Sequence, residues 1–277
     1  MLILDFDGTV TDAEAEGAPF REGYLEDLSI LTGEPIDAVR VVAEEIEATV
    51  QADPNAHGWI YAGRIVAPAT VDPYLRVMPV ARAVFDRFGV FPGADDRRRL
   101  LDGILYKYNY QKTNTAFRPG AYELLHALVG TDSYVVTNSH TDPVQAKIRT
   151  LGDAGQSLDW WLPRVRGSAR KYAVDDQFDA IDAEMELPGL SRPVLLRRRL
   201  YHDAVAALLA AAGATWADLL VVGDIFELDL AMPLAMGARV GLVVNEFTPA
   251  YERAFVETHP RGTVLRSLDD VLPLVGS

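Results

Sequence analysis

Short apolar runs alternate with helical repeats along much of the chain. The runs are continuous, rich in β-branched residues and bounded by polar positions, as is typical of strands that are buried on both faces. Their alternation with helical segments predicts βαβ units. The predicted fold class is therefore α/β, with a parallel sheet in a three-layer αβα core. The apolar runs occupy residues 1–4, 133–136, 162–166, 219–222, 239–244 and 263–265.

A different pattern fills residues 13–116, where apolar residues recur at helical spacing. Three helical faces are predicted, beginning at Ile36, Val80 and Leu100. Residues 53–79 contain prolines at 54, 68, 73 and 79 and are predicted to be connecting loops, with short helical turns at most. The sequence thus predicts a core of residues 1–12 and 117–277 and a helical module of residues 13–116.

The first apolar run ends in two carboxylates, Asp5 and Asp7. Alternation along an extended chain sends both to the same side. Such close carboxylates repel each other, and a divalent cation with oxygen ligands is the simplest way to offset that repulsion. Gly8 lets the backbone turn close to a ligand, and Thr9 adds a hydroxyl. The alternative is a β-hairpin turn at Asp7-Gly8, although the acidic stretch that follows has little to pair with.

Two later apolar runs also end in chemically capable side chains. Thr137 and Asn138 follow one, and Asp224 follows another. In parallel α/β sheets, ligands bind beyond the carboxyl ends of the strands, which makes these residues candidates for one site. Two simpler interpretations stay open: Thr137 and Asn138 start a turn, and Asp224 caps a helix that begins near Glu227.

Composition narrows the classes of function. The net charge of -14 and the pI near 4.7 disfavour nucleic acid and anionic membranes as partners. A phosphate site would need local cations. The chain has no cysteine, so disulfides, zinc-thiolate sites and thiol catalysis are excluded. No basic, apolar and small-residue sequence typical of a secretory signal opens the chain, so we expect a cytoplasmic protein.

Taken together, these strand-end motifs resemble those of the haloacid dehalogenase superfamily, in its phosphatase branch. Asp5-Phe6-Asp7-Gly8-Thr9-Val10-Thr11 resembles its first motif and Val135-Val136-Thr137-Asn138 its second. Val221-Val222-Gly223-Asp224, followed by Asp229, resembles its fourth. The resemblance implies a Rossmann-like catalytic core and a helical cap inserted between the first and second motifs, at residues 13–116. It implies a hydrolase that acts on phosphate monoesters.

The resemblance also implies roles for the paired carboxylates. Asp5 would attack phosphorus and form an aspartyl phosphate. Asp7 would protonate the leaving group and later activate water. Dehalogenases and phosphonate-cleaving members lack an aspartate at the position of Asp7, so its presence favours phosphate chemistry. Gly8 and Thr9 would lie beside the bound substrate.

The other motifs would supply phosphate and metal ligands. Thr137 and the backbone amide of Asn138 would bind a phosphoryl oxygen. Asp224 would bind Mg²⁺ together with the Asp5 carboxylate and the main-chain carbonyl of Asp7. Asp229 would ligate the metal or orient its water. The expected cofactor is Mg²⁺, and the expected partner is a small phosphorylated substrate.

The third motif of the family is a lysine or arginine that neutralises the nucleophile. Of the four lysines, Lys107 and Lys112 lie in the helical module and Lys147 lies inside a predicted helix. Lys171 is therefore preferred, although an unusually long stretch separates it from Asp224. Arg198 is the rival. The compact ammonium of lysine suits a crowded site beside carboxylates.

Several segments have two interpretations. Residues 106–112 mix tyrosines with lysines and would face the substrate or form the solvated end of an amphipathic helix. His140 would reach a ligand or have no role. Residues 172–199, acidic and then basic, are predicted to be solvated loops. The functional alternatives are a phosphomutase or phosphotransferase of the same superfamily, or a binding module without turnover.

Overall fold

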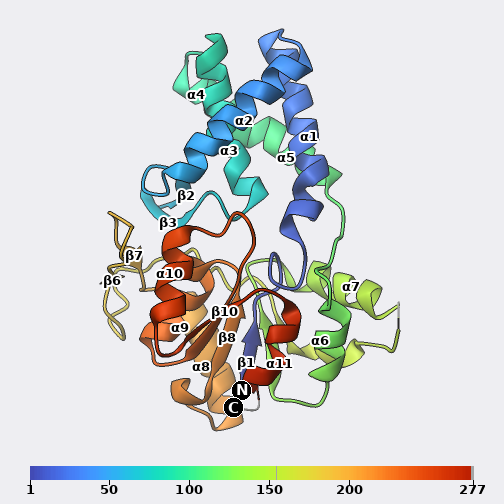
Figure 1. Ribbon diagram of the computed structural model, residues 1–277, viewed down its shortest axis with the longest axis vertical. Helices are drawn as coiled ribbons and strands as arrows, with labels where there is room; N and C mark the ends of the chain where they lie inside the picture. Colours follow the sequence, from blue (N-terminus) through green and yellow to red (C-terminus); the bar gives the residue numbers. More distant parts are fainter. Residues whose placement is uncertain (154, 276–277) are drawn as a thin grey trace. The chain divides into compact units, whose positions relative to one another are not determined.

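The computed structural model describes residues 1–153 and 155–275, and its central feature is a six-stranded parallel sheet (Figure 1). The strand order is β10-β9-β8-β1-β4-β5, and every neighbouring pair is parallel. This architecture confirms the predicted α/β class. The strands are β1 (Leu2–Leu4), β4 (Ser133–Val136), β5 (Val165–Arg166), β8 (Leu220–Gly223), β9 (Arg239–Val243) and β10 (Gly262–Leu265).

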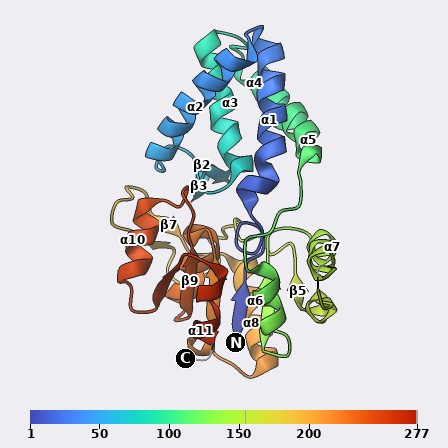
Figure 2. The ribbon, with the colours of Figure 1, turned by 45° about the vertical axis from the view of Figure 1, so that its right-hand side comes forward.

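Helices cover both faces of this sheet (Figure 2). The strand β1 shows how alternation divides the core: Ile3 packs into one apolar cluster, whereas Leu2 and Leu4 pack into the other. Each of these side chains is at most 1% exposed, and burying one contributes about 1.5–3 kcal/mol. The Ile3 side is covered by α8 (Arg199–Ala212), α9 (Ala231–Ala235) and α10 (Ala250–Thr258). The opposite side is covered by α6 (Ala121–Ala127), α7 (Thr141–Gly152) and α11 (Leu272–Val275).

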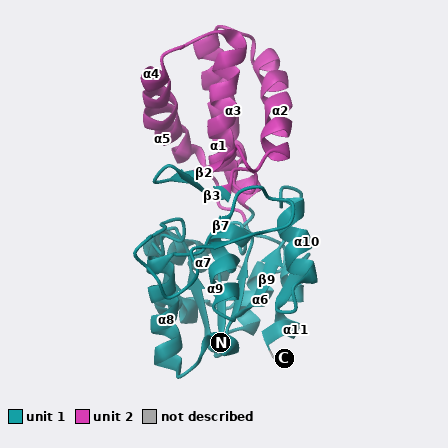
Figure 3. Cartoon of the chain, turned by 90° about the vertical axis from the view of Figure 1, so that its left-hand side faces the viewer, with its two compact units in different colours: residues 1–12, 60–67, 117–277 teal, residues 13–59, 68–116 magenta. Residues whose placement is uncertain are grey.

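The chain divides into two compact units (Figure 3). The sheet and its helices belong to unit 1, which comprises residues 1–12, 60–67 and 117–277. The helical unit comprises residues 13–59 and 68–116. Residues 60–67 thus group with the sheet, whereas the sequence had placed them in the helical module.

The helical unit has an apolar core of its own. On α2, Val39, Ala43 and Val50 are buried as the helical spacing predicts. The third predicted face differs, because Ile104 is 52% exposed and Tyr108 is 59% exposed. The π-helical turn Arg99–Leu105 shifts the spacing there. The helices are α1 (Ala13–Thr32), α2 (Ile36–Ala52), α3 (Pro73–Phe88), α4 (Ala94–Arg98) and α5 (Tyr106–Asn109). No described helix combines the length and apolar character that a bilayer span requires.

The prediction of loops over residues 53–79 is wrong. Strands β2 (Gly58–Tyr61) and β3 (Arg64–Pro68) pair across a turn in which Ala62 and Gly63 both have positive φ. Ala-Gly lacks the asparagine or aspartate that usually marks such a turn. The helix α3 then begins at Pro73, where no N–H is needed, and Asp72 caps it by accepting a 2.7 Å hydrogen bond from the Tyr74 amide.

The segment over residues 172–199 is not simply a solvated loop. Strands β6 (Glu184–Met185) and β7 (Val194–Leu195) pair in antiparallel fashion. The carboxylate of Glu184 is exposed, but Leu187, Val194 and Leu196 pack into the core beneath the sheet. The strand predicted over residues 162–166 is also shorter, because a 3-10 helix, Asp159–Arg164, contains Pro163 and leaves only β5 in the sheet.

Candidate active site

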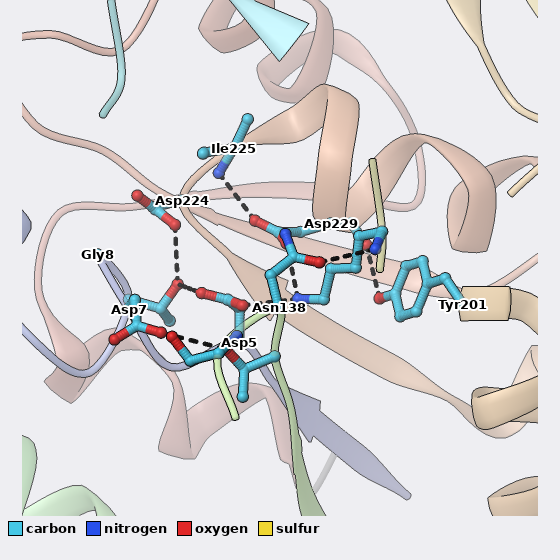
Figure 4. Close-up of polar contacts among 12 residues, drawn as sticks. Asp5, Asp7, Gly8, Asn138, Tyr201, Asp224, Ile225 and Asp229 are labelled. Carbon is cyan, nitrogen blue, oxygen red and sulfur yellow. Dashed lines mark hydrogen bonds and ion pairs between the residues drawn. The ribbon is translucent and has the colours of Figure 1, made fainter. Parts of the chain in front are cut away.

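The carboxyl ends of three neighbouring strands bring the predicted motifs to one edge of the sheet. Leu4 lies opposite Val135 on β4 and opposite Val222 on β8. Because all three strands run in the same direction, Asp5, Thr137 and Asp224 follow at the same edge. Figure 4 shows Asp5, Asp7, Asn138, Asp224 and Asp229 gathered there. The alternative of a β-hairpin after β1 is wrong, since among the described residues β1 pairs only with β4 and β8, both in parallel.

Asp5 is nearly buried and lies against an ammonium and a hydroxyl. Asp5 is 6% exposed. Lys171 Nζ donates to its Oδ1 at 2.6 Å. Thr9 Oγ1 lies 3.2 Å from Asp5 Oδ2 and also 3.2 Å from Asp224 Oδ1, and its single proton serves one of them at a time. Asp5, for which the resemblance implies the role of nucleophile, is therefore paired with one ammonium and lies beside one hydroxyl.

Lys171 links Asp5 to a second carboxylate. Its ammonium also donates to Asp229 Oδ1 at 2.8 Å, and the residue is 1% exposed. Asn138 Oδ1 accepts a 2.7 Å hydrogen bond from the Lys171 backbone amide. Ser168 and Arg170, just before the lysine, have positive φ, a strained conformation for residues with side chains. The hydrogen bond to Asn138 and these backbone angles together fix the conformation of the loop that carries Lys171.

Arg198, the rival cation, contacts no carboxylate of the site. It is fully buried, and its guanidinium donates to the backbone carbonyls of Leu195 (3.1 Å), Val66 (2.8 Å) and Lys171. Arg198 therefore ties the loop of Lys171 to the segment that contains β3. Of the two candidates for the third motif, it is Lys171 that contacts Asp5.

Asp224 and Asp229 lie on the turn after β8. Ile225 N donates to Asp229 Oδ2 at 3.1 Å, and Tyr201 OH donates to the Asp229 carbonyl at 2.9 Å. Gly8 has a φ of +83°, and a Cβ there would lie 2.2 Å from Asp224 Oδ2. The first motif therefore needs glycine for both its turn and its approach to Asp224. Ile225, not Asp224, precedes the helical turn Phe226–Leu230, so the interpretation of Asp224 as a helix cap is wrong.

No protein-family model matches the chain, and no curated protein sequence matches it. Several solved structures are similar to the chain over nearly its full length. A predicted phosphoglycolate phosphatase from Haemophilus somnus 129pt is 14% identical, with a TM-score of 0.54 over 99% of this chain and 96% of that chain. A conserved haloacid dehalogenase-like protein of unknown function from Agrobacterium tumefaciens is 15% identical, with a TM-score of 0.52 over 99% and 96%. The putative HAD-hydrolase YfnB from Bacillus subtilis, bound to magnesium, is 15% identical, with a TM-score of 0.50 over 100% and 98%.

The chain has the haloacid dehalogenase fold. The likeness covers nearly the whole of each chain, so it includes both units and not the sheet alone. This finding confirms the fold that the strand-end motifs implied.

Within this haloacid dehalogenase fold, Asp7 occupies a different environment from Asp5. Thr137 Oγ1 donates to Asp7 Oδ2 at 3.2 Å, and Lys147 Nζ donates to Asp7 Oδ1 at 3.2 Å. Ser139 N in turn donates to Thr137 Oγ1 at 3.2 Å. The two carboxylates of the first motif are therefore held by different partners, one by a buried ammonium and the other by a hydroxyl and a half-buried ammonium.

Sequence reasoning missed two cations of this site. Lys147 was set aside because it lies inside a helix, yet α7 carries it to Asp7. The available signal was its spacing, three residues after the buried Val144 and one before the buried Ile148, which puts it at the edge of the packed face. Arg118 Nε donates to the Gly8 carbonyl at 2.7 Å, a contact that no sequence pattern marks.

Two other candidates make contacts with residues outside the carboxylate cluster. His140 Nδ1 lies 2.9 Å from Ser168 Oγ and precedes α7, so it links two loops. In residues 106–112, Tyr106 and Tyr110 stack with ring centroids 5.9 Å apart, and the buried Asn109 donates to Asp27 Oδ2 at 2.7 Å. These contacts lie inside the helical unit and are structural.

Burial and like charges dominate the electrostatics of the site. Burial raises the pKa of Asp5 to about 7; Lys171 opposes the rise and Asp229 adds to it. Burial, followed by the charges of Asp229 and Asp5, raises the pKa of Asp224 well above its usual value. Burial lowers the pKa of Lys171, but Asp229 and Asp5 more than offset this effect, so its pKa is raised. The buried carboxylates Asp5, Asp224 and Asp229 therefore carry more negative charge than Lys171 alone can neutralise.

The donor set fits a hard divalent cation. Carboxylate oxygens of Asp5, Asp224 and Asp229 lie within 4.8 Å of one another, and all three residues are buried. Lys171 already contacts Oδ1 of Asp5 and Oδ1 of Asp229. The oxygens of Asp224 and the second oxygen of Asp5 receive only the Thr9 hydroxyl as a side-chain donor among the described residues. Mg²⁺ prefers such oxygen ligands, and its charge would offset theirs.

Proposed function

We propose that the chain is a magnesium-dependent phosphatase that hydrolyses a small phosphorylated metabolite. The observation that carries the proposal is the arrangement around Asp5: one buried carboxylate lies within 2.6 Å of a lysine and shares a hydroxyl with a second carboxylate. In this proposal Asp5 is the nucleophile, Lys171 is its neutralising cation and Asp224 is a metal ligand. The haloacid dehalogenase fold supports a hydrolase of this kind.

In the proposed reaction, Asp5 Oδ attacks phosphorus and the ester bond to the leaving group breaks, which leaves an aspartyl phosphate. Asp7 donates its proton to the departing oxygen. It later takes a proton from the water that attacks phosphorus, and the bond between phosphorus and the Asp5 oxygen breaks to release phosphate. Lys171 neutralises Asp5 and the phosphoryl oxygens. Thr137 and Asn138 supply donors to a phosphoryl oxygen, and Gly8 and Thr9 lie beside the substrate.

Asp5, Asp224 and the main-chain carbonyl of Asp7 would hold Mg²⁺, with Asp229 orienting one of its waters. When bound, the metal supplies positive charge to the phosphoryl oxygens. Asp229 is the weaker candidate for a direct ligand, because one of its oxygens accepts from Lys171 and the other from the Ile225 amide. The helical unit would act as a cap that excludes water and large polymers, which favours small substrates.

Dehalogenation is another activity to separate from phosphate hydrolysis, since one of the similar structures, a protein of unknown function, is named haloacid dehalogenase-like. The presence of Asp7, held between Thr137 and Lys147, favours phosphate chemistry, since a carboxyl group there can serve the leaving oxygen. Oxygen-18 separates the two. In H₂¹⁸O, hydrolysis of an aspartyl phosphate at phosphorus puts the label in phosphate, whereas hydrolysis of an aspartyl ester at carbon puts it in Asp5.

The first test is turnover of p-nitrophenyl phosphate with Mg²⁺ and with EDTA. We expect activity with Mg²⁺, its loss with chelator, and a fall of at least about 10³-fold in Asp5→Asn, which removes the nucleophile but keeps the shape. Asp179→Asn, an exposed change on the same unit, is the matched control and should retain activity. Full activity in Asp5→Asn, or turnover insensitive to EDTA, would exclude the mechanism.

A further inference from the structure

Lys147 is a second lysine at the site, separate from Lys171. It extends from α7 to Asp7, with its Nζ 3.2 Å from Oδ1 and 6.0 Å from the ring centroid of Phe6. Its side chain is 23% exposed, whereas that of Lys171 is 1% exposed. Lys171 is enclosed between two carboxylates, whereas the side chain of Lys147 is partly exposed to solvent.

Because the chain is strongly acidic, a partly exposed cation such as Lys147 can matter for the binding of an anionic substrate. A protein with a net charge of -14 repels anionic substrates, so binding depends on local positive charge. An ammonium has three donors on a flexible stem and can contact more than one oxygen. Lys147 can therefore contact Asp7 and an anionic group of a bound molecule.

We propose that Lys147 determines specificity by binding a second negative group, carried by the leaving group of the substrate. The inference rests on the proposed function, in which Asp7 lies within about 3 Å of the ester oxygen. Lys147 Nζ is 3.2 Å from Asp7 Oδ1, so the ester oxygen would lie within roughly 6 Å of the ammonium. A carboxylate or phosphate one or two bonds beyond that oxygen is within reach of the lysine. The preferred substrate class is a phosphate monoester with an adjacent anionic group.

A narrower role for Lys147 must be distinguished from this one. The lysine could act only by orienting Asp7, since it and Thr137 hold the two oxygens of that carboxylate. An orienting role would affect every substrate equally. A specificity role would affect only ligands that carry the second anion, so a pair of ligands that differ in that group separates the two.

The test uses two non-hydrolysable inhibitors of p-nitrophenyl phosphate turnover, 3-phosphonopropionate and propylphosphonate. They have similar shape, but the first ends in a carboxylate and the second in a methyl group. We expect the natural chain to bind 3-phosphonopropionate about tenfold more tightly, as one charge-assisted hydrogen bond provides, and Lys147→Met to lose that preference. Lys147→Arg should retain most of it.

Arg149→Met is the matched control, because Arg149 is an exposed cation on the same helix and its loss changes the net charge equally. It should keep the full ratio of inhibition constants. Lys147→Gln tests the same point if Lys147→Met does not fold. The proposal is overturned if the natural chain shows no preference, or if Lys147→Met and Lys147→Gln keep it. Failure of the proposed function looks different: the natural chain would not turn over p-nitrophenyl phosphate at all.

Discussion

The strand edge of unit 1 and the surface of the helical unit hold their ionic groups in different ways. At that edge, Asp5, Lys171, Asp224 and Asp229 are each at most 6% exposed; Lys171 pairs with Asp5 and Asp229, and carboxylate oxygens of the three aspartates lie within 4.8 Å of one another. In the helical unit, several ion pairs lie on the surface, such as Arg87 and Glu45, whose side chains are 60% and 59% exposed. Surface pairs of this kind contribute less than about 1 kcal/mol each.

The two arrangements of charge have different effects on the stability of the folded chain. The helical unit is held by apolar packing, with Phe20, Val84 and Phe85 fully buried, and its surface charges are nearly dispensable. The strand edge of unit 1 buries like charges, which costs stability. Such a cluster persists where it is needed for chemistry. The contrast therefore supports the proposal that the active site lies at the strand edge of unit 1.

The largest expected effect is that of Lys171→Met. Removing the ammonium leaves Asp5 and Asp229 buried without their cation, so we expect a loss of about 3–5 kcal/mol in the free energy of unfolding, measured by urea denaturation without Mg²⁺. Lys107→Met, an exposed change in the helical unit, should stay within about 0.5 kcal/mol. Equal effects in the two variants would remove the contrast between the units.

An intermediate effect is expected for Asp224→Asn. We expect Mg²⁺ to stabilise the natural chain by about 2–3 kcal/mol at a hundredfold excess over the dissociation constant, and this stabilisation to disappear in the variant. Without Mg²⁺ the variant should be the more stable of the two, because one buried like charge has been removed. Thermal unfolding with and without the metal measures both changes.

Asp95→Asn, a highly exposed change in the helical unit, provides the control for Asp224→Asn, and its response to Mg²⁺ should equal that of the natural chain. A natural chain whose melting temperature does not respond to Mg²⁺ would contradict the assignment of Asp224 as a metal ligand.

The smallest expected effect is on stability and concerns the helical unit, in which Asp72 is a partly buried carboxylate. Burial raises its pKa to about 6, although the amides of Tyr74 and Leu75 oppose the rise. A raised carboxyl pKa means that the folded state disfavours the charged form. Its contribution to stability is therefore greatest below pH 3.8 and is lost as the pH rises through 6.

Asp72→Asn keeps an oxygen that can accept at the helix cap but does not ionise. Relative to the natural chain, we expect it to gain about 1 kcal/mol between pH 4.5 and pH 7.5, a value reduced because Asp72 keeps some contact with water. Urea denaturation at the two pH values measures the difference. A gain that shrinks with rising pH would show that the sign is wrong.

The sequence by itself determined the sheet and the residues at its edge. Apolar runs that end in Asp5, Thr137 and Asp224 need only local information, because strand period and strand ends follow from neighbouring residues. Parallel strands then bring those ends to one edge whatever the detailed packing. Lys171 could also be chosen over Lys107 and Lys112 by its place in the chain.

The tertiary structure alone showed that Lys147 and Arg118 also lie at that edge and that Arg198 does not pair with its carboxylates. Lys147 contacts Asp7 across 140 residues of chain, Arg118 contacts Gly8 across 110, and Arg198 donates to Val66 across 132. It also decided that residues 60–67 belong with the sheet. These contacts depend on where long side chains extend after helices and loops have packed. Because an ammonium or guanidinium can reach several partners from one backbone position, sequence spacing does not specify which one it meets.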